Sequence, residues 1–352
     1  MSEQVWILGA TGRIGRTVAA GLTEHGIEPV RVGRNPEAMP AGSLVVRDMA
    51  EIAAEIARRR PAVVVNAVGD YAATALTVAR AGLPGRTHYL DVANDLVAVP
   101  RLLAAHAEAA ASGSTLVTGA GFGVLATEAV VAELTEGRPA PSRVRVDALA
   151  SVALESGVLG SGYATTMVDV LVRGGRRIRD GHLVKSRLAA NPRTLTLPDG
   201  ATVKSAEVAS GELLAVAAPD VSVTSSLAPA SAAVRALLPV MAGLLAIPAV
   251  RRFAIARLAA LPIKAAPRPR PHSWGHAVVE WPDGTTREGW LRAGDGMDYT
   301  AAVLTQAAVR LLGGGIEPGA FTPAAAFGAG LAEAAGGTFL LDGDRQGRIA
   351  ST

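Results

Sequence analysis

The 352-residue chain contains no cysteine, which excludes disulfide bonds, thiolate metal sites and a cysteine nucleophile. It also lacks a strong excess of either charge, since 34 lysines and arginines stand against 31 aspartates and glutamates. This small excess does not build a basic face for nucleic acid, so we expect no nucleic-acid partner. A chain without cysteine suits a reducing compartment, and we expect a cytoplasmic protein.

The sequence also lacks a long, uninterrupted hydrophobic run. Residues 236–250 are apolar, but two prolines interrupt them, and a spanning helix needs roughly 20 apolar residues. We therefore expect no transmembrane span, but a buried helix pair or an apolar lid over a pocket. Apolar residues flanked by arginines suit a membrane interface, yet Arg251, Arg252 and Arg257 do not fall on one helical face, which argues against peripheral membrane contact.

Signals for export and for several kinds of catalysis are missing as well. The first residues have no charged and long apolar regions of a secretory signal, so we expect no export. No G-x-S-x-G element or P-loop is present, which argues against a hydrolase or a kinase. His272 and His276 have a spacing that suits a metal only on a helix, and they fall in an expected strand, so we predict no metal site.

What the sequence does contain is a high fraction of core-forming residues. Hydrophobic residues make up 49% and charged residues 18% of the chain, which is typical of a folded protein with a large core. The length is enough for two domains. Up to about residue 120, short β-branched runs alternate with helical stretches, and this βαβ pattern predicts a parallel sheet covered on both faces.

A glycine-rich turn near the N-terminus carries the main functional signal. It follows the apolar segment Val5–Leu8, which is typical of a buried strand, and precedes apolar residues at helical spacing. Its three glycines let the backbone turn tightly, let a pyrophosphate approach the amides, and let the helix lie close to its strand. We therefore predict a dinucleotide site at Gly9, Ala10, Thr11, Gly12, Arg13, Ile14 and Gly15.

The residue after the second strand indicates which nucleotide is bound. An acidic residue there would hold the ribose 2′-hydroxyl of NAD, whereas an arginine suits the 2′-phosphate of NADP. The chain has Arg34 at this place, and Arg13 is a second candidate contact, so we predict NADP in preference to NAD. Further predicted cofactor contacts are Gly33, Asn35, Asp48 and Met49, the last two near the adenine.

The ends of the later strands supply candidates for the catalytic site. Residues 62–69 predict a central strand buried on both faces, whose carboxyl end lies where ligands bind in such sheets. Ala67, Val68 and Gly69 are therefore predicted to line the nicotinamide ribose. The candidate proton donors are Tyr71, Asp91 and Tyr163, and after them His272 and His276.

The pattern changes after residue 139. Residues 142–154 alternate between apolar and polar, which predicts a long, half-buried strand of an antiparallel sheet. Two Pro-Asp-Gly turns, at 198–200 and 282–284, predict hairpins. Helices are expected at 298–312 and from 324 to about 335.

Several of these segments occur in an order that resembles a known family. They are residues 9–15, Gly33-Arg34, the strand end at 65–69, residues 88–93, Gly121-Phe122 before a helix, and residues 321–325. In this order they resemble the saccharopine dehydrogenase-like oxidoreductases, in particular the branch of trans-acting enoyl reductases. The chain departs from the family at Asp70, where relatives have a proline, and at residues 123–126, so the relatives' substrate is not carried over.

The resemblance implies an α/β fold with a Rossmann-type doubly wound parallel sheet and an inserted α+β substrate domain. The dinucleotide-binding domain is expected at 1–124, and the inserted domain, which covers the nicotinamide, at 125–297. The C-terminal helices at 298–352 are expected to return to the first domain.

The predicted function is hydride transfer between NADP and a C=C, C=N or C=O group of a small substrate, either apolar or a biosynthetic intermediate. Two other classes fit the same nucleotide site: a redox sensor that binds NADP without turnover, and a cyclase or isomerase that retains the nucleotide as a structural element. The inserted domain with its apolar segment favours a small-molecule pocket and argues against the sensor. Exposed strand edges and apolar helices favour a homodimer.

Overall fold

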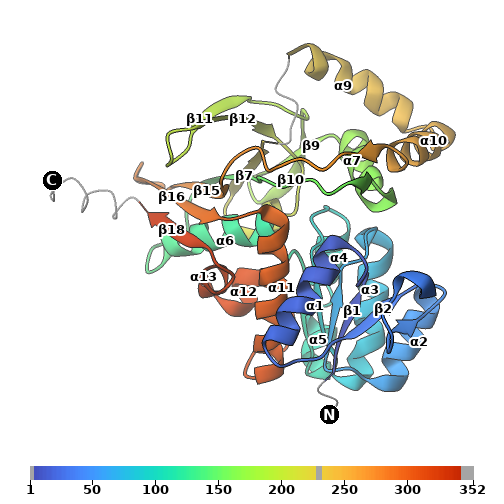
Figure 1. Ribbon diagram of the computed structural model, residues 1–352. Coiled ribbons are helices and arrows are strands. Elements are labelled where there is room, and N and C mark those ends of the chain that lie inside the picture. Colours follow the sequence, from blue (N-terminus) through green and yellow to red (C-terminus); the bar gives the residue numbers. More distant parts are fainter. Residues whose placement is uncertain (1–3, 227–231, 342–352) are drawn as a thin grey trace. The chain divides into compact units, whose positions relative to one another are not determined.

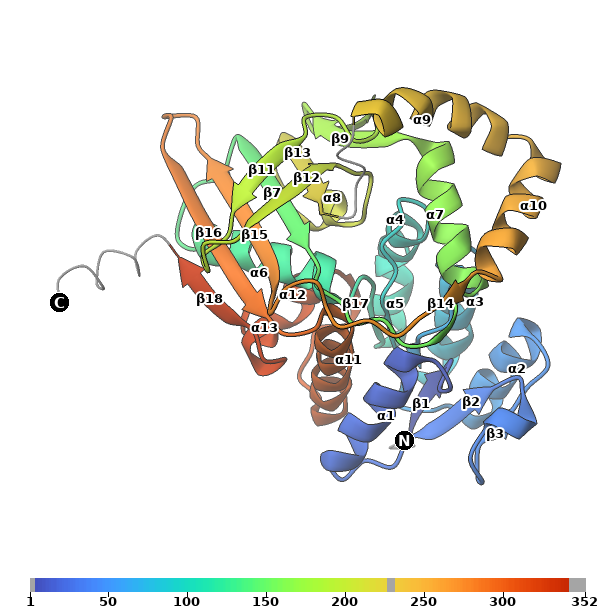
Figure 2. The ribbon, with the colours of Figure 1, turned by 45° about the horizontal axis from the view of Figure 1, so that its top comes forward.

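The structure is a computed structural model that describes residues 4–226 and 232–341, with the backbone alone at 161–163, 166 and 232–235. It divides into two compact units, shown from two directions in Figures 1 and 2. The first unit comprises residues 1–125 and 297–336, and the second comprises residues 126–296 and 337–352. The chain therefore passes between the units three times, and each unit is built from two separate pieces of sequence.

The first unit contains a seven-stranded sheet with the order β17-β6-β5-β4-β1-β2-β3, in which all neighbours are parallel. Its strands are β1 (Val5–Leu8), β2 (Val30–Gly33), β3 (Leu44–Val45), β4 (Val63–Asn66), β5 (His88–Asp91), β6 (Thr115–Val117) and β17 (Gly319–Phe321). The order runs outward from β1 to β3 on one side and from β4 to β6 on the other, so the direction of winding reverses between β1 and β4. The predicted Rossmann-type α/β sheet is confirmed.

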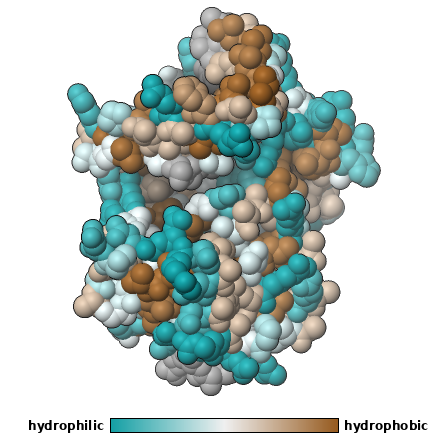
Figure 3. Space-filling model, turned by 90° about the vertical axis from the view of Figure 1, so that its right-hand side faces the viewer, coloured by the Kyte–Doolittle hydropathy of each residue, from teal (hydrophilic) through white to brown (hydrophobic). Residues whose placement is uncertain are grey.

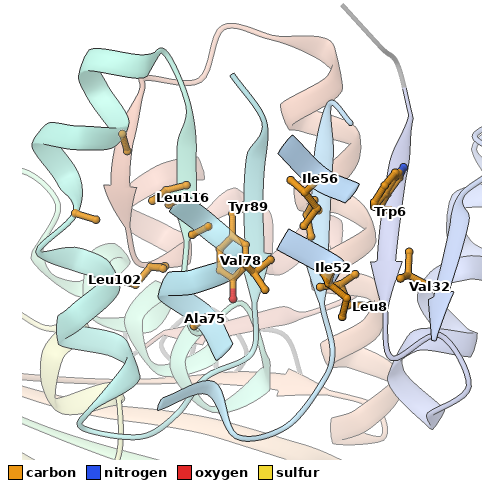
Figure 4. Close-up of a cluster of buried hydrophobic side chains, with 14 of the residues drawn as sticks. Trp6, Leu8, Val32, Ile52, Ile56, Ala75, Val78, Tyr89, Leu102 and Leu116 are labelled. Carbon is orange, nitrogen blue, oxygen red and sulfur yellow. The ribbon is translucent and has the colours of Figure 1, made fainter. Parts of the chain in front are cut away.

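Helices connect these strands and bury the apolar residues of the sheet. They are α1 (Arg13–Glu24), α2 (Met49–Arg59), α3 (Tyr71–Gly82), α4 (Ala98–Leu103), α5 (His106–Ser112), α11 (Gly296–Gly313), α12 (Pro323–Phe327), α13 (Gly330–Ala334) and the short 3₁₀ helices at Pro36–Ala38 and Leu83–Gly85. Figure 4 shows Ile52 and Ile56 of α2 and Val78 of α3 packed beside the strands. Each such side chain, once fully buried, contributes about 1.5–3 kcal/mol to stability.

The opposite face of this sheet is covered by α1 and α11. Val18 and Leu22 of α1 are fully buried, as their helical spacing predicts. The two helices approach closely at Gly21, where a Cβ atom would lie 2.9 Å from the hydroxyl oxygen of Thr305. This close approach holds the residues after 296 in the first unit.

The second unit contains a mixed sheet of nine strands with the central order β10-β9-β13-β7-β15-β16-β18, while β11 pairs with β12 and β12 with β13. Its strands are β7 (Arg143–Leu149), β9 (Gly175–Arg179), β10 (His182–Ser186), β11 (Arg193–Thr196), β12 (Thr202–Glu207), β13 (Asp220–Ser225), β15 (Ser273–Glu280), β16 (Thr286–Ala293) and β18 (Thr338–Leu341). A separate small pair consists of β8 (Gly157–Val158) and β14 (Pro262–Ile263). Both predicted Pro-Asp-Gly hairpins are confirmed, as β11–β12 and β15–β16.

The helices of this unit are α6 (Phe122–Thr135), which starts in the first unit, α7 (Ser161–Arg173), α8 (Glu212–Ala215), α9 (Ala232–Leu245) and α10 (Pro248–Ala259). Helix α6 packs closely on one face of the sheet. A Cβ atom on Gly275 would lie 2.7 Å from the Cβ of Ala126, and one on Gly289 would lie 3.1 Å from a methyl of Val130. These two glycines let the helix approach the strands.

The strand predicted at 142–154 is corrected in length and in pairing. β7 ends at Leu149, because the Ser151 amide and hydroxyl bond to the Ser273 hydroxyl and the Arg270 carbonyl in place of a neighbouring strand. β7 is antiparallel to β15 but parallel to β13, so the sheet is mixed. The parallel pair is possible because a long crossover, residues 150–219, separates its strands.

Two further expectations need correction. The apolar segment predicted as a buried helix pair forms α9 and α10, which are largely exposed. Among the described side chains of α9, Leu238 alone is buried, with 5% exposure. The segment 298–352, predicted to hold helices of the first unit, also contains β17 and β18, and β18 pairs with β16 of the second unit.

Candidate dinucleotide site

The glycine turn lies between β1 and α1, at the carboxyl edge of the parallel sheet. Gly9 has a φ of +78°, and a Cβ atom on it would lie 2.9 Å from the carbonyl oxygen of Ala67. A Cβ atom on Gly15 would lie 2.4 Å from the carbonyl oxygen of Gly9. A side chain at Gly9 would push the turn away from the end of β4, and one at Gly15 would push α1 away from the turn.

The first turn of α1 suits an anion. Its N-cap residue is Gly12, whose lack of a side chain means that no side-chain cap occupies the helix end, and no acidic residue lies in the first turn. The turn is held by two hydrogen bonds, from the Gly12 amide to the Gly9 carbonyl (3.0 Å) and from Arg16 Nη1 to the Thr11 carbonyl (2.7 Å). Helix amides and the helix dipole favour negative charge at such an end.

The predicted contacts at the end of β2 and directly after it have different surroundings. Asn35 caps the 3₁₀ helix at Pro36–Ala38 by accepting a hydrogen bond from the Glu37 amide at 3.1 Å. Gly33 packs beneath the side chain of Met39. Arg34 follows directly after the strand and is exposed. The structure therefore places Arg34 where sequence reasoning expected the residue that selects the nucleotide.

The other predicted cofactor contacts have structural partners. Arg13 forms an ion pair with Asp298 of α11, with a distance of 2.8 Å between Nη2 and Oδ1. Asp48 caps α2 by accepting a hydrogen bond from the Glu51 amide at 2.9 Å, and Met49 packs against the core. Sequence reasoning missed the role of Asp48, because an N-cap and a ligand contact require the same kind of residue.

A buried network joins the ends of β4, β5 and β6. Asn66 donates to the Tyr89 hydroxyl at 3.0 Å and accepts from the Val68 amide at 3.1 Å, and Tyr89 donates to Asp91 at 2.9 Å. Thr118 after β6 donates to the same carboxylate at 2.8 Å. The network therefore fixes the backbone at Val68, beside the predicted ribose contacts Ala67 and Gly69.

Asp91 is fully buried and is saturated with donors. Besides Tyr89 and Thr118, the amides of Ala93 and Gly119 donate to it, at 3.0 and 3.1 Å. Burial raises the pKa of Asp91, although these hydrogen bonds act in the opposite direction. The four hydrogen bonds that Asp91 accepts hold its neighbours in place.

The two candidate tyrosines lie in different units. Tyr71 begins α3, directly after Asp70, whose φ of +60° turns the chain from the end of β4 into the helix. Burial, and then the charges of Asp91 and Asp95, raise the pKa of Tyr71, so its hydroxyl keeps its proton at neutral pH. Tyr163 lies in α7 of the second unit, and its side chain is outside the described residues.

His276 belongs to a second buried network, which sequence reasoning missed. Its Nδ1 lies 2.5 Å from Asp147 and its Nε2 lies 3.0 Å from Glu288, while its ring stacks on Trp290 at 3.8 Å. Arg145 and Thr224 also contact Asp147. The available signal was a charged residue within the alternating pattern of residues 142–154, on the face opposite the valines. His272, the remaining candidate, packs edge-on against Trp274 of β15 at 5.8 Å.

No protein-family model matches the sequence, and no curated protein matches it. Apo saccharopine dehydrogenase (L-Glu forming) from Saccharomyces cerevisiae superposes with a TM-score of 0.55 over 97% of this chain and 100% of that chain, at 13% identity. An amine dehydrogenase from Mycobacterium smegmatis and a dihydrodipicolinate reductase from Paenisporosarcina sp. TG-14 give TM-scores of 0.48 and 0.42, each over 92% of this chain, with 12% and 10% identity.

The comparison with saccharopine dehydrogenase shows a shared fold. It covers both units, so it extends beyond the nucleotide-binding sheet. Fold and site together define the class as a Rossmann-type α/β protein with a second α+β unit and a glycine turn of the dinucleotide-binding kind.

Proposed function

We propose that this protein is an NADP-dependent oxidoreductase. The observation that carries the proposal is the packing of the glycine turn, in which Gly9 lies against Ala67 and Gly15 against Gly9 with no space for a side chain. This packing brings the start of α1 to the point where the sheet reverses its winding, which is where α/β sheets bind nucleotides.

Arg34 supports NADP as the preferred nucleotide. It is exposed directly after β2, at the position where NAD-binding sheets carry an acidic residue. An arginine there offers a planar group of five donors to the 2′-phosphate of the ribose. Arg13 is the less suitable partner, since its guanidinium already pairs with Asp298.

Bound NADPH would supply a hydride to a C=C, C=N or C=O group. The resemblance to enoyl reductases favours a small, apolar acceptor with an activated double bond. The chain itself orients the reactants, because the network through Asn66, Tyr89 and Asp91 holds the backbone at Val68.

We assign proton donation to Tyr71 and positioning to Asp91. Tyr71 lies directly after the strand end and retains its proton at neutral pH, so it can donate a hydrogen bond to the acceptor. Asp91, whose carboxylate oxygens accept four hydrogen bonds, acts on the reaction only through the residues that it holds.

Nucleotide binding is tested by calorimetry with NADPH and NADH. The wild-type protein should bind NADPH more tightly, Gly15→Val should abolish binding of both, and Arg34→Glu should reverse the preference. The control is Arg193→Glu, an identical charge change at an exposed arginine on β11 of the second unit. If neither nucleotide binds, the proposal fails. If Arg34→Glu leaves the preference unchanged, its NADP part fails.

Turnover is tested separately by following nicotinamide absorbance with conjugated enals, cyclic imines and aldehydes as acceptors. We expect oxidation of NADPH with at least one of these classes, and a lower kcat in Tyr71→Phe with NADPH affinity unchanged. Tight NADPH binding without oxidation by any of them would contradict the oxidoreductase and favour a non-redox role for the nucleotide.

A further inference from the structure

Helices α9 and α10 expose apolar residues in a regular pattern. Leu237, Val240, Met241 and Leu244 recur at the spacing of one face of α9, and they are 42–62% exposed. Ile247, Val250 and Phe253 are also exposed, at the bend and along α10, with Phe253 66% exposed. We call these seven residues the α9–α10 face. Figure 3 shows hydrophobic atoms gathered at the top of its view.

This face is the reverse of an ordinary amphipathic helix. In α9 the buried residue Leu238 packs with Leu188, Ala189 and Ala206, and the apolar residues around it point outward. A helix of a water-soluble protein normally turns its apolar stripe toward the core and its charged residues outward. A contiguous exposed apolar surface of this kind marks a contact with a partner or a membrane.

The segment that contains the face carries charges of one sign only. Residues 221–279 contain seven arginines and lysines and no aspartate or glutamate. Arg251 points to α7, where it pairs with Asp169, whereas Arg252 and Arg257 are exposed and the Arg257 guanidinium lies 5.8 Å from the ring centre of Phe253. The two outward arginines therefore share the exposed side of α10 with apolar residues, which sequence reasoning about all three arginines did not foresee.

The helices are too short and too bent to cross a bilayer in the ordinary way. Among the described residues no single helix is long and apolar enough to span, while Ala236–Leu245 and Pro248–Ala259 meet that test only as a pair bent by 108°. Pro239 lies inside α9 and Pro248 starts α10, so neither helix can extend through the other. Two short helices with apolar side chains and arginines suit the plane of a membrane surface.

We propose that the α9–α10 face binds the surface of an anionic lipid bilayer, with its apolar side chains in the acyl boundary and Arg252 and Arg257 among lipid phosphates. Charge complementarity favours this partner over a second copy of the chain. A symmetric dimer through this face would bring the same cationic surfaces together, with no acidic residue from 221–279 to neutralise them. The proposal is independent of the nucleotide site.

The test is flotation of the full-length protein with phosphatidylcholine vesicles, with and without phosphatidylglycerol. Wild type should float with the anionic vesicles and much less with the neutral ones, and high salt should weaken the binding. Arg252→Gln/Arg257→Gln should weaken binding to anionic vesicles by about 25-fold, since each arginine near an anionic surface contributes about fivefold. Val240→Ser/Leu244→Ser/Phe253→Ser should abolish it.

The matched controls are Leu183→Ser, an exposed apolar residue of β10, and Arg193→Gln on β11, which should leave binding unchanged. Fluorescence of Phe253→Trp should shift to shorter wavelength on anionic vesicles only. The proposal would be overturned if the wild-type protein did not float with the vesicles. It would also be overturned if the double arginine variant and the triple serine variant both retained binding. A dimer in sedimentation experiments that dissociates in the triple variant, without flotation of wild type, would overturn it in favour of self-association.

Discussion

Among the described residues, each unit has one aspartate in its sheet that is completely buried, Asp91 in β5 and Asp147 in β7, and the two carboxylates have different surroundings. Asp91 is held by hydroxyl and amide donors, which are neutral, and burial raises its pKa. For Asp147 burial acts in the same direction, but the contact with His276 and the charges of His276 and Arg145 outweigh it and lower the pKa. Neutral donors thus offset desolvation only in part, whereas charged partners more than offset it.

The difference corresponds to what each network supports. The Asp91 network ends at the Val68 amide, in the loop of the candidate dinucleotide site. The Asp147 cluster lies on the sheet of the second unit, where His276 stacks on Trp290 and reaches Glu288. A charged cluster stabilises only while every partner is present, so the two units should respond very differently to loss of one group.

The largest expected effect is that of Asp147→Ala. It leaves His276 and Arg145 without their shared counter-ion inside the protein, which should cost about 3–5 kcal/mol of unfolding free energy. Urea denaturation followed by tryptophan fluorescence measures this, since three of the four tryptophans lie in the second unit. Glu136→Ala at an exposed position is the control, with a change within about 0.5 kcal/mol. An equally small change in Asp147→Ala would refute the cluster as a stabilising unit.

Asp91→Asn should have a smaller effect on stability and an added effect on binding. The new amide group faces the Tyr89 and Thr118 hydroxyls and two backbone amides, so at least one buried donor loses its acceptor, at about 1–3 kcal/mol. NADPH affinity should fall because Val68 loses its support, whereas Asp147→Ala should leave affinity unchanged under native conditions. Calorimetry of both variants decides this, and equal losses of affinity would contradict the assignment of Asp91 to the site.

Tyr89→Phe removes one link of the same network and keeps the ring in the core. We expect a loss of about 0.5–1.5 kcal/mol, because the hydroxyl that joins Asn66 to Asp91 is gone. NADPH affinity should fall less than in Asp91→Asn. A larger effect than that of Asp91→Asn would show that the aromatic residue, and not the carboxylate, organises the strand ends.

The smallest expected effect concerns the pH dependence of stability, which should differ between the two aspartates. A lowered pKa means that the contribution of Asp147 is full above pH 3.8 and is lost as the pH falls through its folded value. Asp147 and Glu288 raise the pKa of His276 against the effect of burial, so its contribution is full below pH 6.5 and is lost as the pH rises through the folded value. The cluster should therefore contribute most to stability between pH 3.8 and pH 6.5.

Asp91 should show the opposite trend. Because burial raises its pKa, its contribution is present below pH 3.8 and is lost as the pH rises through the folded value. On acidification, the stability difference between wild type and Asp147→Asn should shrink, and that between wild type and Asp91→Asn should grow. Urea midpoints across the acid range measure both, and parallel trends would contradict the comparison.

Local patterns were sufficient to predict the first unit. The glycine turn, the apolar strands and the helix containing Val18 and Leu22 each follow from spacing within a few residues, and their order along the chain defines the Rossmann-type sheet. Arg34 could be placed for the same reason. The capping roles of Asn35 and Asp48 were not predicted, since such a role depends on which backbone amide lies near the side chain.

Sequence was a poorer guide to the second unit because its arrangement depends on pairings between distant strands. Residues 143–149 pair with a strand more than 70 residues away and with another more than 120 residues away, and neither partner is visible in the local pattern. The same holds for Asp147 and His276, which meet only because β7 and β15 are neighbours. The exposure of α9 and α10 also contradicts the usual inference that apolar helices are buried.

The late position of β17 and β18 in the chain constrains synthesis. An emerging chain cannot complete the edge of the first sheet before Gly319–Phe321 has been made, nor cover β16 before Thr338–Leu341 has followed. During translation β6 and β16 therefore present unpaired edges until residues 319–341 have left the ribosome. A protein ending before residue 338 would keep the nucleotide turn intact and yet display an open β16 to any neighbouring strand.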